Sequence, residues 1–136
     1  MAEAKKLYGH LIAEIEKLNI GYIQLSRYLT MLDPVGRGLK DLDVVAEFRP
    51  LIQNAAVFLN GDYDGAKAEA VLTAKQADAV SFGRPFIANP DFPLRVQNKL
   101  PLVMPDFTKL YGINAADGSV KDRVDGYTSY PPATVA

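Results

Sequence analysis

Three short apolar segments constrain this chain more than any other feature. They are residues 20–26, 55–59 and 77–82, and turns containing Gly61 and Gly83 follow the second and third. Apolar side chains stand at consecutive positions in them, which is typical of parallel strands that helices cover on both faces. Helical segments separate the three, and that alternation implies right-handed crossovers in a parallel sheet. The sequence therefore predicts an α/β fold with three parallel strands and helices on their outer side.

The segments between these strands carry helical signals. Leu7, Leu11, Ile15 and Leu18 recur at helical spacing, so we expect residues 3–18 to form an amphipathic helix that packs through this stripe. Aspartates accept hydrogen bonds well at the first position of a helix. We accordingly expect Asp41 or Asp43 to begin a helix through Arg49, Asp64 to begin one over residues 65–76, and Pro93 to open a short one to Asn98.

The connection over residues 27–40 is long for a compact domain and contains Pro34, Gly36 and Gly38. Long loops at strand ends often carry function. One interpretation is that Arg27, Tyr28, Arg37 and Lys40 reach over the strand ends toward a ligand. The other is that the segment is a solvated connector.

Composition limits the classes of function. The 136 residues are enough for one domain, in which we expect βα units over residues 1–100 and an irregular tail over 101–136. The net charge of −1 argues against a nucleic-acid or membrane partner. One histidine and no cysteine predict no metal site. The absence of an apolar leader or membrane-length segment predicts a soluble, cytoplasmic protein.

The run from Ala77 to Asp91 reads as a strand, a glycine turn, an arginine and a proline suited to the first turn of a helix. Glycine lets backbone N–H groups approach a ligand, and the guanidinium of Arg84 matches a phosphate. Gly61 offers a similar turn after the preceding strand. The residues therefore indicate an anion site, with a plain turn and a solvated charge as the alternative.

These motifs together resemble a known family. Residues 81–92, Gly61-Asp62-Tyr63, Leu110-Tyr111-Gly112 and residues 125–131 are similar, in order and over nearly the whole chain, to the C-terminal part of the old yellow enzymes. That family comprises FMN-dependent NAD(P)H ene-reductases folded as a (β/α)₈ TIM barrel. The resemblance implies a partial TIM barrel in which the three strands correspond to barrel strands 6–8.

The resemblance also implies a cofactor site. By match, Gly61 and Asp62 follow strand seven and Gly83 and Arg84 follow strand eight, where the family binds the FMN phosphate. Phe86 matches an aromatic position beside the cofactor. Tyr111 matches a tyrosine near flavin and substrate, although it can equally be a core residue of the tail. Asp62 stands where the family has an uncharged residue, and a carboxylate about 4–6 Å from a phosphate costs roughly 1–4 kcal/mol.

Two functions follow from the resemblance. In the first, the chain is the C-terminal half of an FMN-dependent ene-reductase using NADH or NADPH and supplies the FMN phosphate-binding loops. In the second, it is a redox-inactive truncated homologue that acts as a binding scaffold or as an isomerase or cyclase-like biosynthetic enzyme. Catalytic residues stay unknown, because the family carries them in its first five βα units. A small-molecule ligand is expected, together with a homo-oligomer or a complementary chain that carries the first barrel half.

Overall fold

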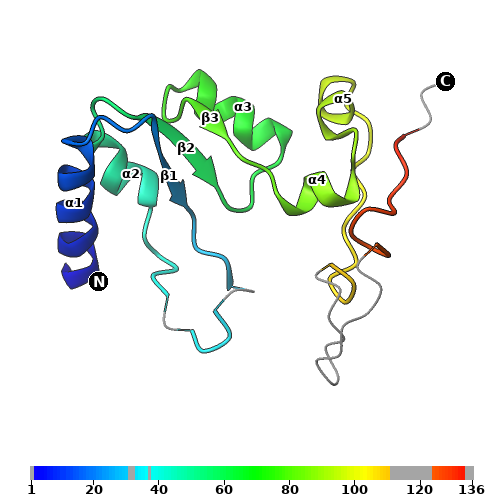
Figure 1. Cartoon of the computed structure of the whole chain (residues 1–136), viewed down its shortest axis with the longest axis horizontal. Coiled ribbons are helices and arrows are strands. Elements are labelled where there is room, and N and C mark those ends of the chain that lie inside the picture. The colour runs from blue at the N-terminus through cyan, green and yellow to red at the C-terminus, as the bar shows by residue number, and fades with distance from the viewer. Residues whose placement is uncertain (1, 31–32, 37, 111–123, 134–136) are drawn as a thin grey trace. The chain divides into compact units, whose positions relative to one another are not determined.

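The computed structural model describes residues 2–30, 33–36, 38–110 and 124–133. The chain divides into two compact units, Met1–Ser81 and Phe82–Ala136, which are described separately (Figure 1). Tyr111 and Arg37, both named above as candidate ligand contacts, lie outside the described residues. The single domain predicted from the chain's length stays a prediction.

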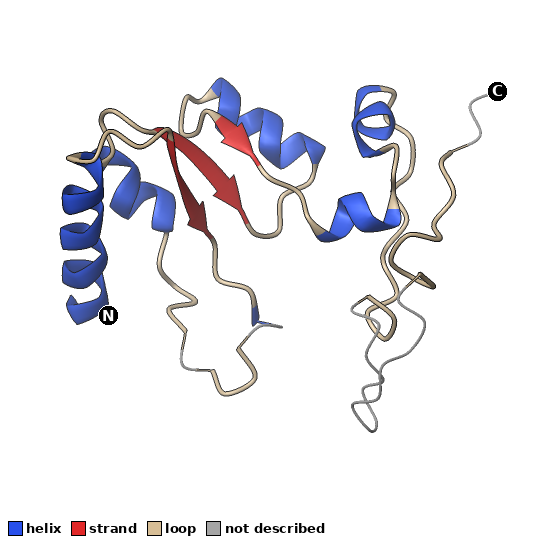
Figure 2. Cartoon of the chain, viewed as in Figure 1, coloured by secondary structure: helices blue, strands red, loops and turns tan. Residues whose placement is uncertain are grey.

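The first unit is built on a parallel sheet of three strands, as the sequence predicted. The strands β1 (Tyr22–Ser26), β2 (Ala56–Asn60) and β3 (Ala79–Val80) lie in the order β1-β2-β3 (Figure 2). Ile23 pairs with Val57, and Leu59 pairs with both Leu25 and Val80. Three parallel strands in sequence order, with helices between them, form part of a TIM barrel, and the predicted fold class is confirmed.

The third strand is shorter than the predicted 77–82, and Asp78 explains why it begins later. Its backbone N–H donates to the carbonyl of Val57 at 2.8 Å, but its carboxylate also accepts the N–H of Val57 at 2.7 Å. The Asp78 carboxylate therefore accepts the Val57 N–H, which regular strand pairing would direct to a backbone carbonyl. The apolar run is visible in the sequence, but the replacement of a backbone acceptor by the Asp78 side chain is not.

Four helices of the first unit lie wholly within the described residues. They are α1 (Ala2–Glu16), α2 (Val44–Phe48), η2 (Arg49–Leu51) and α3 (Gly65–Thr73). Asp43, and not Asp41, begins α2, because its carboxylate accepts the N–H groups of Val45 and Ala46. Asp64 begins α3 as predicted, accepting the N–H of Lys67 at 2.8 Å.

The core of this unit lies on one face of the sheet. Leu25, Val57 and Leu59 are buried there. Neighbouring residues of parallel strands in this register point to the same side, so these three share the face that the helices cover. The core also includes buried side chains from the helices. They are Ile12 in α1, Phe48 in α2, Ile52 directly after η2, and Ala68 in α3.

Helix α1 forms as predicted but does not pack through the predicted stripe. Leu7, Leu11 and Leu18 are exposed, whereas Ile12 and Glu16 are buried. The ring of Tyr8 meets Phe48 edge-on at 6.1 Å between centroids. The stripe prediction was wrong because contacts from distant segments, and not apolar spacing alone, determine which side of the helix faces the sheet.

The described part of the second unit contains two short helices. These helices are α4 (Arg84–Ala88) and α5 (Phe92–Gln97), each with a proline in its first turn. The predicted start of α5 at Pro93 is therefore correct to within one residue. In the described part of the chain, no helix is both long enough and apolar enough to cross a membrane.

Candidate functional site

The carboxyl ends of the strands in the first unit carry a cluster of hydrogen-bonded polar side chains. The Nδ2 of Asn60 donates to both the carbonyl and the hydroxyl oxygen of Ser81, at 3.0 Å each. The hydroxyl of Ser81 donates in turn to Oε1 of Gln24 at 3.1 Å. By the strand register this cluster lies on the face opposite the helices, the face that lines the interior of a closed barrel.

Sequence reasoning missed these three residues. Polar side chains at alternate positions near the ends of otherwise apolar strands were the available signal. The same face carries Tyr22 stacked on Phe58, with ring centroids 4.5 Å apart, at the other end of the strands. The inner face is thus aromatic at one end and polar at the end where the predicted cofactor turns begin.

Gly61 follows β2 directly and has a backbone conformation that favours glycine. Its φ is +102°, and a Cβ added there would come within 3.0 Å of the Cβ of Arg27. The N–H of Arg27 donates to the carbonyl of Asn60 at 2.9 Å, which holds the two segments together. Close packing against Arg27 therefore already requires glycine at position 61.

The turn also presents backbone donors. Within the described residues, the N–H groups of Gly61 and Asp62 donate to no acceptor. Both residues have positive φ, at 102° and 56°. Consecutive N–H groups in such a turn form a concave donor surface that suits an anion. The turn after β2 therefore fits a phosphate group through its backbone.

The carboxylate of Asp62 is directed to solvent. Its side chain is 77% exposed, and Nζ of Lys67 lies 3.4 Å from Oδ2. The same ammonium lies 3.6 Å from Oδ2 of Asp64 and donates to the backbone carbonyl of Asp62. The hydrogen bond from the Lys67 backbone, opposed by some desolvation, lowers the pKa of Asp64. The negative charges near this turn are thus accompanied by a cation.

The other predicted cofactor residues lie in the second unit. Gly83 precedes α4, and its carbonyl accepts the N–H groups of Phe86 and Ile87 at 2.9 and 3.1 Å. The guanidinium carbon of Arg84 lies 5.9 Å from the centre of the Phe107 ring. Phe86 is exposed and lies 6.0 Å from the Phe92 ring. Within this unit, a Cβ added to Gly83 would meet no atom closer than 4 Å.

Histidine, aspartate and glutamate are the residue types in this chain that bind metals most readily. Across the described ranges, no group of three or more histidine, aspartate or glutamate side chains is placed to hold a metal ion. The first unit offers backbone N–H donors, the cation Lys67, and the amide and hydroxyl groups of the inner-face cluster. The second unit offers the cation Arg84.

Comparison with characterised proteins gives relatives across almost the entire chain. The chain is 30% identical to a chanoclavine-I aldehyde reductase of Penicillium roqueforti over 137 residues, which is 96% of this chain and 33% of the relative. It is 27% identical to a 12-oxophytodienoate reductase-like protein of Solanum lycopersicum, over 99% of this chain and 33% of the relative. A probable inactive reductase of Epichloe festucae is 30% identical over 91% of this chain and 32% of the relative. No family model matches.

Solved structures agree with these relatives. The old yellow enzyme of Trypanosoma cruzi superposes with a TM-score of 0.73 at 30% identity, covering 96% of this chain and 30% of that enzyme. Morphinone reductase in complex with tetrahydroNAD gives a TM-score of 0.67 at 28% identity, covering 96% of this chain and 31% of the reductase. The chain spans about a third of the length of these proteins. It is a homologue of the old yellow enzyme family that matches the C-terminal part of the family's TIM barrel.

Proposed function

We propose that this chain supplies the FMN phosphate-binding turns of an old yellow enzyme-type ene-reductase. The observation that carries the proposal is the turn after β2, where the N–H groups of Gly61 and Asp62 have no acceptor among the described residues. Gly83 and Arg84, at the start of α4, supply a second turn and a guanidinium. A phosphate held by backbone N–H groups and one arginine gains charge-assisted hydrogen bonds.

Each residue has a limited task in this proposal. The bound FMN supplies hydride chemistry, with NADH or NADPH as the reductant. Gly61 and Asp62 bind the phosphate through their backbone, and Arg84 balances its charge. Phe86, exposed on α4, lies against the cofactor. Tyr111 lies outside the described residues, and its position near the flavin and the substrate stays a prediction. The cytoplasmic location stays a prediction.

A second candidate has a specific observation in its favour. One relative at 30% identity is named a probable inactive reductase. A redox-inactive homologue would keep the barrel strands and use them as a binding scaffold, or as an isomerase or cyclase-like catalyst. An absorbance spectrum separates the two candidates, because a flavin that stays with the purified protein colours it yellow.

We also propose that the chain works within an assembly. Exposed apolar side chains lie on α1, in the turn that follows it and at the start of β1: Leu7, Tyr8, Leu11, Leu18, Ile20 and Tyr22. Among the described strands, β1 and β3 each leave one edge unpaired. Such edges and patches are stabilised by further strands or by a second copy of the chain. A homodimer or a chain carrying the first five βα units would cover them.

Replacing Arg84 tests the FMN proposal. Arg84→Ala is expected to weaken FMN binding at least tenfold, about 1.4 kcal/mol, because the guanidinium no longer balances the phosphate. Isothermal titration of the 136-residue chain with FMN measures the change. The control Lys6→Ala removes one exposed cation from α1 and should leave the dissociation constant unchanged. An Arg84→Ala variant that binds FMN as well as the parent would remove Arg84 from the site.

The same titration tests the role of Asp62. Its carboxylate is exposed and near Lys67, so Asp62→Ala should leave FMN affinity unaltered. Affinity that rises on this substitution would show that the carboxylate faces the phosphate.

A further inference from the structure

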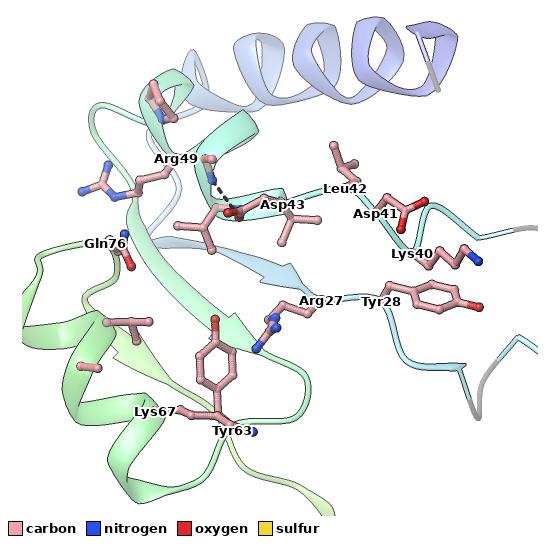
Figure 3. Close-up of a pocket in the computed structure, with 16 residues that line it drawn as sticks. Arg27, Tyr28, Lys40, Asp41, Leu42, Asp43, Arg49, Tyr63, Lys67 and Gln76 are labelled. Atoms are coloured by element: carbon pink, nitrogen blue, oxygen red, sulfur yellow. Dashed lines mark hydrogen bonds between the residues drawn. The ribbon is translucent and has the colours of Figure 1, made fainter.

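A groove lies between α2 and α3, over the ends of β1 and β2, on the side of the sheet that the helices cover (Figure 3). Its volume is about 690 Å³, within the range of small-molecule sites. Apolar side chains make up much of its wall: Leu42, Val44, Val45, Ala46, Pro50, Ala70 and Val71. All of the groove's lining belongs to the first unit. None of it belongs to the turn at Gly83.

Tyr63 contributes a largely buried ring to this groove, and its hydroxyl is open to the groove. The residue is only 9% exposed, and its hydroxyl makes no hydrogen bond with any residue that the structure describes. Figure 3 shows the phenol standing upright in the groove with its oxygen toward Asp43 and the guanidinium of Arg27. A buried tyrosine usually finds a partner for its hydroxyl. The Tyr63 hydroxyl has no such partner among the described residues and opens into the groove, so it is available to a ligand there.

Arg27 supplies a second unused set of donors beside it. Its guanidinium carbon lies 5.3 Å from the centre of the Tyr63 ring. The side chain has no hydrogen bond or ion pair in the described part of the chain, and it points toward Tyr63 (Figure 3). A guanidinium offers a planar fork of N–H groups that matches the two oxygens of a carboxylate.

The charges around the groove favour an anion. Four basic residues line it, Arg27, Lys40, Arg49 and Lys67, against two acidic ones, Asp41 and Asp43. The carboxylate of Asp43 is engaged with the first turn of α2. Lys67 is accompanied by Asp62 and Asp64, and Arg49 donates to the carbonyl of Ile52. Among the described residues, the polar ends of Arg27, Lys40 and Tyr63 have no hydrogen-bond partner, and Nε of Arg49 is buried without one. These groups are available to a ligand's charged end, and Arg27 and Tyr63 are the two that lie side by side.

We propose that this groove binds a small aliphatic carboxylate. The carboxylate oxygens accept hydrogen bonds from Arg27 and from the Tyr63 hydroxyl, and the alkyl body packs on the valine and alanine side chains of α2 and α3. The groove's lining includes none of Gly61, Asp62, Gly83 and Arg84, although Arg27 packs against Gly61, and the proposal needs no flavin.

Titration of the 136-residue chain with hexanoate tests the proposal. We expect saturable binding that Tyr63→Phe and Arg27→Gln each weaken at least tenfold. Hexanamide has the same alkyl chain but no charge, and inorganic phosphate has charge but no alkyl chain. Each should bind at least tenfold more weakly than hexanoate. Lys6→Gln, which removes an exposed cation outside the groove, should leave the affinity unchanged, and so should saturating FMN.

The thermal midpoint of Tyr63→Phe separates ligand binding from a structural role. Removing a hydroxyl that has no partner should leave the midpoint unchanged or raise it slightly. A lower midpoint would show that the hydroxyl has a partner within the protein and would overturn the proposal. Absence of saturable hexanoate binding, equal affinity in Tyr63→Phe, or phosphate binding as tight as hexanoate would also overturn it. None of these outcomes bears on FMN binding, which Arg84→Ala tests separately.

Discussion

Glu16 joins the end of α1 to the segment that leads into β2. Its carboxylate accepts three backbone N–H groups, from Gln53 and Asn54 at 2.8 Å and from Ala55 at 3.2 Å. The hydrogen bonds from Asn54 and Gln53 lower the pKa of Glu16 against the opposing effect of desolvation. One side chain thus satisfies three consecutive donors that no strand or helix uses.

Glu16→Gln should lower the thermal midpoint at neutral pH. An amide is a weaker acceptor than a carboxylate, and its NH₂ group faces N–H donors. A carboxyl whose pKa is depressed on folding stabilises the protein above its unfolded pKa, and this stabilisation is lost as the pH falls through the folded pKa. The difference between parent and variant should therefore shrink below about pH 4. Melting curves across pH, with Glu69→Gln as an exposed control, measure it. A difference that does not change with pH would contradict the prediction.

Individual residues show what the sequence can and cannot specify. Asp64 was predictable as a helix start because capping needs only neighbours three residues away. Gly61 was predicted from ligand approach, but its close contact with Arg27 depends on a residue 34 positions earlier in the chain. The inner-face cluster of Gln24, Asn60 and Ser81 likewise depends on strand register, which the sequence alone does not give.

At the scale of elements, α4 and α5 hold the tail through buried polar side chains. Asn89, fully buried, donates to the carbonyls of Pro85 and Val103 and accepts the N–H of Val103. Arg95 pairs with Asp91 at 2.7 Å and donates to the carbonyl of Pro101. Residues 101–103, which follow α5, are thus tied back to the ends of both helices by side-chain hydrogen bonds.

Asn89→Ala should destabilise the second unit by about 2–4 kcal/mol, because it leaves buried backbone groups without partners. Faster proteolytic cleavage between residues 100 and 110, together with a lower urea midpoint, would show this loss of stability. Asn98→Ala is a matched control, since Asn98 is exposed and bonds only to the preceding turn. Equal cleavage rates in the two variants would contradict the role assigned to Asn89.

Helix α1 shows why element existence is easier to predict than element orientation. Local periodicity marks residues 3–18 as helical, and α1 covers most of that range. The buried side is set by Phe48, Glu47 and the segment before β2, all more than 30 residues away. The stripe of Leu7, Leu11 and Leu18 is consequently left exposed for another surface.

At the scale of the whole chain, this exposed stripe predicts association. We expect the 136-residue chain at micromolar concentration to sediment as a dimer or larger species, and not as a monomer of 14.9 kDa. Leu11→Glu should shift the distribution toward monomer, because a charge on the stripe opposes burial. Leu72→Glu, on the surface of α3, serves as the control. A monodisperse parent monomer near 14.9 kDa would contradict the prediction.

The side-chain cluster at the strand ends has a consequence for how the sheet opens. Gln24 belongs to β1, Asn60 ends β2, and Ser81 follows β3, so one chain of hydrogen bonds crosses all three strands. Strand β3 has only two residues and would otherwise fray independently. Because the end of β3 is hydrogen-bonded to both neighbouring strands, detaching it breaks contacts of the entire sheet. We therefore expect the backbone amide hydrogens of the three strands to exchange with solvent as one cooperative unit.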